Sequence, residues 1–192
     1  MAAAGTNFLI AHGSLGSPES NWFPRLKKKL EAEGHRVAAP VFPTPDNQSL
    51  ESWLKTARAA LPNADPAHTV LIGHSTGAVL VLRMAERTTA PYKAVFFICP
   101  FARDLGLTPY DELNASFARP AFDWARVKQG AKRLFCFAGS DDPYVPLDCV
   151  RDVAEKAGAA LTVVEKGGHL NAESGYLEFP LLFDKIHETL SA

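Results

Sequence analysis

The chain has 192 residues, of which 47% are hydrophobic and 21% are charged, and its formal net charge at pH 7 is −1. This length and hydrophobic share are sufficient for one globular domain with a large apolar core, which we expect to span residues 1–192. The near-zero charge argues against nucleic acid or an anionic membrane as a partner, because either would favour an excess of lysine and arginine.

Apolar runs and amphipathic segments alternate along the chain. In chain order they predict strand 7–11, helix 22–33, strand 36–39, helix 50–61, strand 69–73, helix 78–87, strand 93–99, strand 133–138, helix 145–157, strand 160–164 and helix 177–190. An irregular insertion rich in aromatic residues is expected at about 101–126. Because the strands are almost continuously apolar, the pattern predicts an α/β fold, with a mostly parallel sheet covered by helices on both faces.

The stretch Gly73-His74-Ser75-Thr76-Gly77 is the most informative, because it connects a predicted strand to a predicted helix. In this context the pattern G-x-S-x-G is typical of a nucleophile elbow, a sharp turn that exposes the serine hydroxyl above the sheet. Glycine at both ends removes the Cβ atoms that would collide with the neighbouring chain. The alternative is an ordinary turn in which the serine caps the helix. The motif therefore predicts Ser75 as a nucleophile if the chain also supplies its base.

An activated serine needs a histidine base and a carboxylate that orients this base. Of the six histidines, only His169 follows a predicted strand and lies in a glycine-rich loop late in the chain. His74 is adjacent to Ser75, and we expect its side chain to point away from the elbow. The carboxylate is expected after strand 133–138, where Asp141 and Asp142 are both candidates. The alternative for these two residues is a turn that caps the next helix.

Backbone amides are expected to form an oxyanion hole beside the serine. Thr76, directly after Ser75, is the first predicted donor. The second is expected in the glycine-rich loop after strand 7–11, from the amide of Ser14 or Leu15. A plain strand-to-helix turn is the alternative for this loop.

Large side chains near these loops are expected to form the walls of a substrate pocket. The predicted wall residues are Leu15, Phe122, Trp124, Tyr144 and Leu170. For the aromatic residues of the insertion, which include Phe117, the alternative is ordinary core packing.

Three cysteines, at positions 99, 136 and 149, have no metal-ligand spacing, so no metal is expected. No cofactor is expected either. An odd number without a disulfide framework suggests a reducing compartment. Residues 1–5 lack the basic and apolar regions of a secretory leader, and no apolar run is long enough to span a bilayer. The cytoplasm is therefore the expected location.

The chain resembles the α/β-hydrolases, and more closely the small serine hydrolases of the retinoblastoma-binding protein 9/YdeN type. The shared motifs run nearly end to end, at residues 12–13, 34–35, 40–45, 73–78, 117–120, 124, 139–146 and 168–171. The chain order Ser75, Asp142, His169 is the order expected for this superfamily. In the family the triad aspartate is followed by Pro-x-x-Pro, which selects Asp142 over Asp141.

This resemblance implies a three-layer αβα sandwich with about six strands and no large cap domain. It also implies a Ser75-Asp142-His169 triad that hydrolyses small esters or amides, as in a carboxylesterase or an aminopeptidase-like enzyme. The alternatives are an acyl-thioesterase and a non-catalytic protein-interaction module on the same fold. The retinoblastoma-binding member carries an L-x-C-x-E motif, whereas here Cys136 is followed by Phe137 and Ala138. A retinoblastoma-type pocket protein is therefore not an expected partner.

Overall fold

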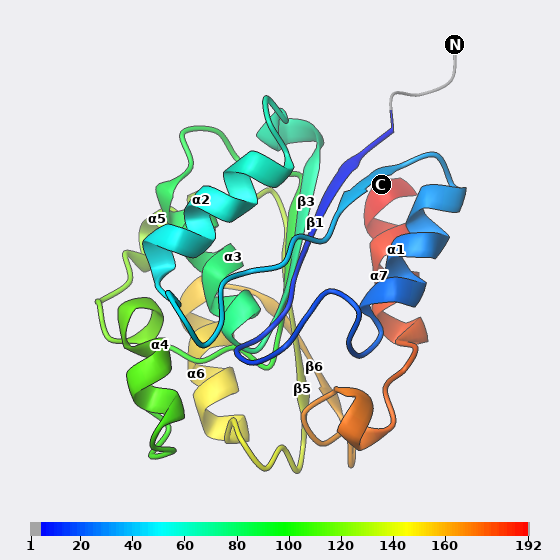
Figure 1. Cartoon of the computed structure of the whole chain (residues 1–192). Coiled ribbons are helices and arrows are strands. Elements are labelled where there is room, and N and C mark those ends of the chain that lie inside the picture. The colour runs from blue at the N-terminus through cyan, green and yellow to red at the C-terminus, as the bar shows by residue number, and fades with distance from the viewer. Residues whose placement is uncertain (1–4, 192) are drawn as a thin grey trace.

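The computed structural model describes residues 5–191; residues 1–4, on which the expectation about a secretory leader depends, and residue 192 lie outside the described part. A parallel sheet of six strands forms the centre, with strand order β2-β1-β3-β4-β5-β6 (Figure 1). The strands are β1 (Asn7–Ala11), β2 (Arg36–Ala38), β3 (Thr69–His74), β4 (Ala94–Ile98), β5 (Leu134–Gly139) and β6 (Ala160–Val164). All six coincide with the predicted strands, which confirms the predicted fold class.

The central strands are the most deeply buried. Every residue of β3 and β4 is buried, whereas no residue of the edge strands β2 and β6 is fully buried. A strand that is covered on both faces must be apolar throughout, because side chains alternate between the two faces. This explains why the β4 run, Ala-Val-Phe-Phe-Ile, has no polar residue.

Helices cover both faces of the sheet and complete a three-layer arrangement (Figure 1). They are α1 (Phe23–Ala32), α2 (Leu50–Ala60), α3 (Thr76–Arg87), α4 (Tyr110–Ala118), α5 (Trp124–Gln129), α6 (Leu147–Ala157) and α7 (Pro180–Ser191), with 3₁₀ turns at Pro66–His68 and Ala172–Ser174. Helices α1 and α7 pack on one face, and α2, α3, α5 and α6 pack on the other. Within residues 5–191, no helix is both long and apolar enough to cross a membrane.

The expectation of an irregular insertion at about 101–126 is wrong in part, because this segment contains α4 and the start of α5. Pro109 directly precedes α4, where a missing N–H costs no helical hydrogen bond. The helical pattern of α4 is also hard to recognise in the sequence, because one of its three buried positions is occupied by a polar residue, Asn114. At the start of α5, the Asp123 side chain accepts from the amide of Arg126 at 3.1 Å.

A buried arginine of α3 holds this segment in place. The Arg83 side chain is 3% exposed, and two of its nitrogens donate to the carbonyl of Phe117 at 3.1 and 3.0 Å. Arg83 also donates to the Pro120 carbonyl, forms a 2.9 Å ion pair with Glu86, and lies 3.4 Å from the centre of the Phe122 ring. Burial lowers the pKa of Arg83, and Glu86 opposes this effect. Charge-assisted hydrogen bonds therefore fix the C-terminal end of α4.

The carboxyl ends of the strands meet at one edge of the sheet. The register pairs Gly73 with Ala11 and Gly139 with Val164, so that the loops following these strands lie next to one another. In parallel sheets such an edge is the usual place for a ligand. The fold thus brings the predicted site residues, which are far apart in the sequence, to one rim.

Candidate active site

Ser75 occupies the turn between β3 and α3 in a conformation that non-glycine residues rarely adopt. Its φ is 56° and its ψ is −122°. Its amide donates to the carbonyl of Ile98 at 2.8 Å, which holds the turn against β4. Such a backbone conformation costs on the order of 1–3 kcal/mol and persists only where the surrounding structure enforces it. The predicted elbow is therefore present as a sharp turn with a strained serine at its apex.

Backbone packing requires the two glycines that flank Ser75. A Cβ atom on Gly73 would lie 2.1 Å from the carbonyl oxygen of Gly77, and one on Gly77 would lie 2.2 Å from that of Ala11. These contacts are with backbone atoms of neighbouring elements, which cannot move aside without shifting the sheet. Glycine at both positions therefore lets α3 start directly against β1 and brings Ser75 next to the loop after β1.

His169 and Asp142 meet in the loops that follow β6 and β5. The Nδ1 of His169 donates to the Asp142 carboxylate at 2.7 Å, and the Asp142 side chain is 1% exposed. The other carboxylate oxygen accepts from the amides of Tyr144 and Val145 at 2.9 and 3.0 Å. Burial by itself raises the pKa of Asp142, but His169 and the two amides outweigh it, so the pKa lies below its usual value. Asp142 is therefore an anion that holds the imidazole in one orientation.

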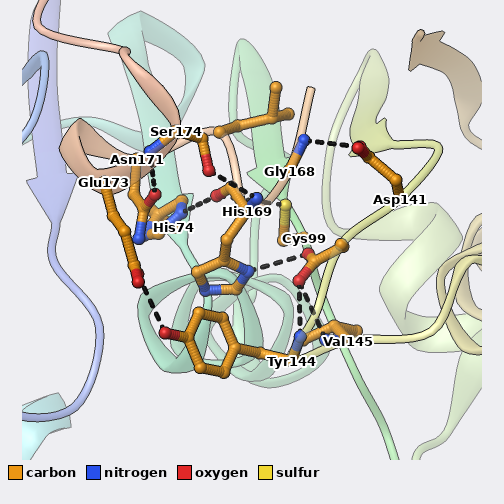
Figure 2. A network of polar contacts seen from close by, with 12 residues as sticks. His74, Cys99, Asp141, Tyr144, Val145, Gly168, His169, Asn171, Glu173 and Ser174 are labelled. Atoms are coloured by element: carbon orange, nitrogen blue, oxygen red, sulfur yellow. Dashed lines mark hydrogen bonds and ion pairs between the residues drawn. The ribbon is translucent and has the colours of Figure 1, made fainter. Parts of the chain in front are cut away.

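Asp141, the other candidate carboxylate, has a different neighbour. It accepts from the backbone amide of Gly168 at 2.8 Å and so shapes the loop that carries His169 (Figure 2). The residue pattern does not decide which of the two aspartates bonds to the imidazole. In the structure it is Asp142 that forms this bond.

Three side chains hold the backbone of His169 (Figure 2). Ser174 Oγ accepts its N–H at 3.1 Å, while His74 Nε2 and Cys99 Sγ donate to its carbonyl at 2.8 and 3.6 Å. The His74 ring lies edge-on, 4.7 Å from the His169 ring, so a side chain expected only to point away from the elbow contacts the loop that carries the predicted base. Burial lowers the pKa of His74 to about 3, and the neighbouring His169 adds to this effect, so His74 is a neutral donor. No local pattern signals this contact, because it joins residues 95 positions apart.

His74, Cys99 and His169 also bring one possible metal-ligand atom each to within 4.8 Å of one another. Burial raises the pKa of the Cys99 thiol well above its usual value, with the nearby Asp142 carboxylate contributing to the effect. Metals bind the thiolate, which this environment disfavours. Both His74 and Cys99 also donate to the His169 carbonyl. We therefore interpret the group as support for the His169 loop.

Ser75 and His169 line one cavity of about 260 Å³ at the carboxyl edge of the sheet. Within residues 5–191, no hydrogen bond joins the Ser75 hydroxyl to the His169 ring, and the Nε2 of that ring has no partner. Such bonds are often long in unliganded sites and tighten when substrate binds. Of the predicted wall residues, Leu15 and Tyr144 line this cavity. Further apolar walls come from Phe23, Phe101, Leu105, Leu107, Tyr110 and Val145.

Three predicted wall residues, Phe122, Trp124 and Leu170, do not line this cavity. Phe122 and Trp124 stack on each other at 4.6 Å, with Phe122 against the guanidinium of Arg83. Leu170 is fully buried in the core layer under α1 and α7, and Phe117 is likewise fully buried on the opposite face. Core packing and the charge of Arg83 therefore determine the positions of these side chains.

His12, which is 1% exposed, holds the loop after β1. Its Nδ1 donates to the carbonyl of Gly13 at 2.8 Å, and its Nε2 accepts from the amide of Phe42 at 3.0 Å. The Gly13 carbonyl also accepts from the amide of Gly16 at 3.1 Å. Because the C=O and N–H of a trans peptide point in opposite directions, this anchoring turns the amide of Ser14 away from His12.

The anchored loop lies directly against the elbow. A Cβ atom on Gly13 would lie 3.0 Å from the Cβ of Ser75 and 3.4 Å from its Oγ. In the described part of the chain, the amides of Ser14 and Thr76 have no hydrogen-bond partner. The N–H of Ser14, in the loop after β1, and the N–H of Thr76, the first residue of α3, are therefore both unpaired beside Ser75.

A polar cluster that the sequence reasoning missed surrounds the residue after Ser75. The Oδ1 of Asn114, on α4, lies 2.7 Å from Ser14 Oγ and 2.9 Å from both Thr76 Oγ1 and Gln48 Nε2. We refer to Ser14, Gln48, Thr76 and Asn114 as the Asn114 cluster. Its only signal in the sequence is a polar residue at a buried position of an amphipathic helix, which is too weak to identify a site.

Known proteins are similar to this chain over nearly its whole length. A family model described as serine hydrolase matches residues 8–188. The YdeN protein of Bacillus subtilis is 30% identical to this chain over 179 residues, which are 92% of each chain. The crystal structure of YdeN superposes with a TM-score of 0.88, and the match covers 97% of this chain and 100% of the YdeN chain. The serine hydrolase RBBP9 of Rattus norvegicus is 28% identical over 170 residues, 87% of this chain and 88% of its own. Est1E from Butyrivibrio proteoclasticus, 16% identical, shares the fold over 100% of this chain and 91% of its own with a TM-score of 0.72.

Proposed function

The chain belongs to the serine hydrolase family, and from this membership we propose that it hydrolyses small esters or amides through an acyl-enzyme formed on Ser75. His169 acts as general base and then as general acid, while Asp142 orients the imidazole and stabilises its charged form. The 2.7 Å bond between His169 Nδ1 and Asp142 carries the proposal, because it leaves Nε2 available in the cavity that Ser75 lines. A base available in this way can activate a serine hydroxyl.

In the proposed reaction, Nε2 of His169 takes the proton of the Ser75 hydroxyl as Oγ attacks the substrate carbonyl carbon. The tetrahedral intermediate collapses when His169 protonates the leaving alcohol or amine. Water then takes the place of the leaving group, and the same proton transfers release the acid and restore Ser75. Asp142 has a lowered pKa and stays ionised throughout, so that it stabilises each imidazolium.

We propose the backbone amides of Thr76 and Ser14 as the oxyanion hole. Neither N–H has a hydrogen-bond partner among the described residues, and Thr76 is the first residue of α3, where the helix end also favours negative charge. The amide of Leu15, the other candidate for the second donor, already donates to Thr44 Oγ1 at 2.8 Å. This hydrogen bond favours Ser14.

Replacement of His12 by leucine is expected to lower kcat by about 10- to 100-fold with little change in KM. The substitution releases the Gly13 carbonyl, so the Ser14 amide is no longer aimed at the oxyanion, which exists only in the transition state and the intermediate. Steady-state kinetics with p-nitrophenyl butyrate measures the effect. His12→Asn, whose amide can still donate to Gly13, should lose less kcat than His12→Leu. A rise in KM alone, or equal losses in both variants, would contradict this role of His12.

The dimensions of the cavity favour a small acyl group. Its volume of about 260 Å³ lies just below the usual range for ligand pockets. We propose esters or amides of short acyl groups as substrates, with acyl-thioesters as the second choice. Est1E, which is similar in fold, has been solved with ferulic acid bound. A panel of p-nitrophenyl ester, aminoacyl-arylamide and acyl-thioester substrates separates these classes.

Fluorophosphonate labelling tests the proposed nucleophile. The folded protein is expected to react at Ser75, because an activated hydroxyl attacks phosphorus and displaces fluoride, and Ser75→Ala should abolish labelling. Ser191→Ala is the control, since the Ser191 hydroxyl donates to the backbone of His187 on α7, at 3.0 Å, outside the residues that line the cavity. An unlabelled, folded wild-type protein would contradict the proposal and would favour a non-catalytic protein-interaction module on this fold.

A further inference from the structure

The side-chain amide of Asn114 has one bonded and one unbonded end. Asn114 is 6% exposed and lines the cavity together with Ser75 and Thr76. Its Oδ1 lies within the Asn114 cluster, whereas no residue in the described part of the chain accepts from its Nδ2. Within residues 5–191 the only fully buried side-chain polar atom without a partner is Oε1 of Gln48, so Nδ2 of Asn114 keeps some accessible surface, in a residue that lines the cavity.

The carbonyl of Leu113 determines which way the Asn114 amide faces. A carbonyl can only accept, so the Gln48 atom that lies 3.2 Å from the Leu113 carbonyl is the donor Nε2. The same nitrogen lies 2.9 Å from the Asn114 atom inside the cluster, which is therefore the acceptor Oδ1. It follows that the NH₂ group of Asn114 faces the cavity.

We propose that Asn114 is a specificity-determining residue that donates to a hydrogen-bond acceptor on the acyl group of the substrate. A largely buried donor without a protein partner is satisfied only when something in the cavity accepts from it. Its hydrogen bonds to Ser14, Thr76 and Gln48 keep the amide from rotating. An acyl chain with an ether, keto or hydroxyl oxygen near the scissile carbonyl supplies the acceptor. The inference rests on the proposed function.

The neighbours of Asn114 assign it to the acyl group rather than to the leaving group. A leaving group must lie beside His169, which protonates it. Asn114 instead bonds to Ser14 and Thr76, the two residues whose amides are the proposed oxyanion donors. An acceptor within its reach is therefore close to the carbonyl carbon, on the side that remains attached to Ser75.

Two matched pairs of substrates test the assignment. p-Nitrophenyl methoxyacetate and butyrate differ only by an oxygen in place of a CH₂ group, and the 3-methoxypropanoate and pentanoate esters differ in the same way one atom further out. Dividing each kcat/KM by the rate constant of alkaline hydrolysis removes the difference in intrinsic reactivity. We expect the wild-type protein to favour the oxygen-containing member of at least one pair by about 3- to 10-fold, the effect of one hydrogen bond.

Asn114→Leu, which is similar in size but has no donor, is expected to abolish this preference. The preference is a ratio within one variant, so a loss of folded protein or of oxyanion stabilisation affects both esters alike. Leu107→Ala is the matched control, because Leu107 lines the same cavity without a polar group, and it should keep the preference. If Asn114→Leu does not fold, Asn114→Asp keeps an oxygen in the cluster and should also lose the preference at mildly alkaline pH.

Equal normalised rates for both wild-type pairs, or a preference that survives the loss of the Asn114 amide, would overturn this role and leave the hydrolase proposal intact. Absence of both ester turnover and fluorophosphonate labelling would overturn the proposed function and this inference together. If Ser75 is labelled but no ester is turned over, the same ratio is measured from the labelling rates of matched alkyl and alkoxyalkyl fluorophosphonates.

Discussion

Replacement of His169 by alanine is expected to reduce kcat/KM for p-nitrophenyl butyrate by about 10⁴- to 10⁶-fold. In the proposed mechanism the imidazole carries the proton in both half-reactions, and its 2.7 Å bond to Asp142 fixes the ring for this task. Without the imidazole, the Ser75 hydroxyl keeps its proton at neutral pH and is a poor nucleophile. Steady-state kinetics of the purified, folded variant measures the loss.

The double variant His169→Ala, Ser75→Ala should be little worse than the more damaged single variant, because the two groups act as one unit. His187→Ala is the control for a histidine outside the site. His187 lies on α7 with its side chain 45% exposed, and its Nε2 bonds to Glu33 at 2.9 Å, so its replacement should leave activity unchanged. A loss below about tenfold in His169→Ala would argue against general-base catalysis by this residue.

Replacement of Arg83 by alanine is expected to lower the free energy of unfolding by about 3–5 kcal/mol. The guanidinium is buried, and it donates hydrogen bonds to the carbonyls of Phe117 and Pro120, which would lose these donors. Its removal also leaves Glu86, whose side chain is 12% exposed, without the cation that neutralises it. Phe122 loses the charge that lies 3.4 Å from its ring centre. Urea denaturation followed by circular dichroism measures the change.

Arg87→Ala is the matched control, one turn further along α3. Arg87 forms its 2.6 Å pair with Glu51 at the surface, where its side chain is 39% exposed. Exposed pairs of this kind contribute about 0–1 kcal/mol to stability. Similar losses of unfolding free energy for Arg83→Ala and Arg87→Ala would show that burial of Arg83 does not have the structural importance assigned to it.

Much of the site could be predicted, because strands are recognised from short apolar runs and the carboxyl ends of parallel strands lie at one edge of the sheet. Ser75 and His169 each follow a predicted strand, and they line one cavity. The pattern alone left Asp141 and Asp142 open; the family resemblance selected Asp142, the one that bonds to His169. Their catalytic roles stay predictions until the variants are measured.

Other parts of the site could not be predicted, because large side chains are placed by partners distant in the sequence. Phe122 and Trp124 looked suitable for a pocket wall, yet they pack with Arg83 of α3. His74 looked as if it would turn away, yet it supports the His169 loop. In both cases the sequence around the residue does not show which distant residue will be its partner.

The sequence by itself determined the strands of the sheet, the strained turn at Ser75 and the loops in which His169 and the two aspartates lie. These features are visible in residues next to one another in the chain: apolar runs, and the close spacing of Gly73, Ser75 and Gly77. Only the tertiary structure decided that Asn114 faces the cavity, since its bonds to Thr76 and Ser14 span 38 and 100 positions of the chain. A hydrogen bond depends on where two side chains meet in space, and that is set by the packing of the whole sheet and its helices.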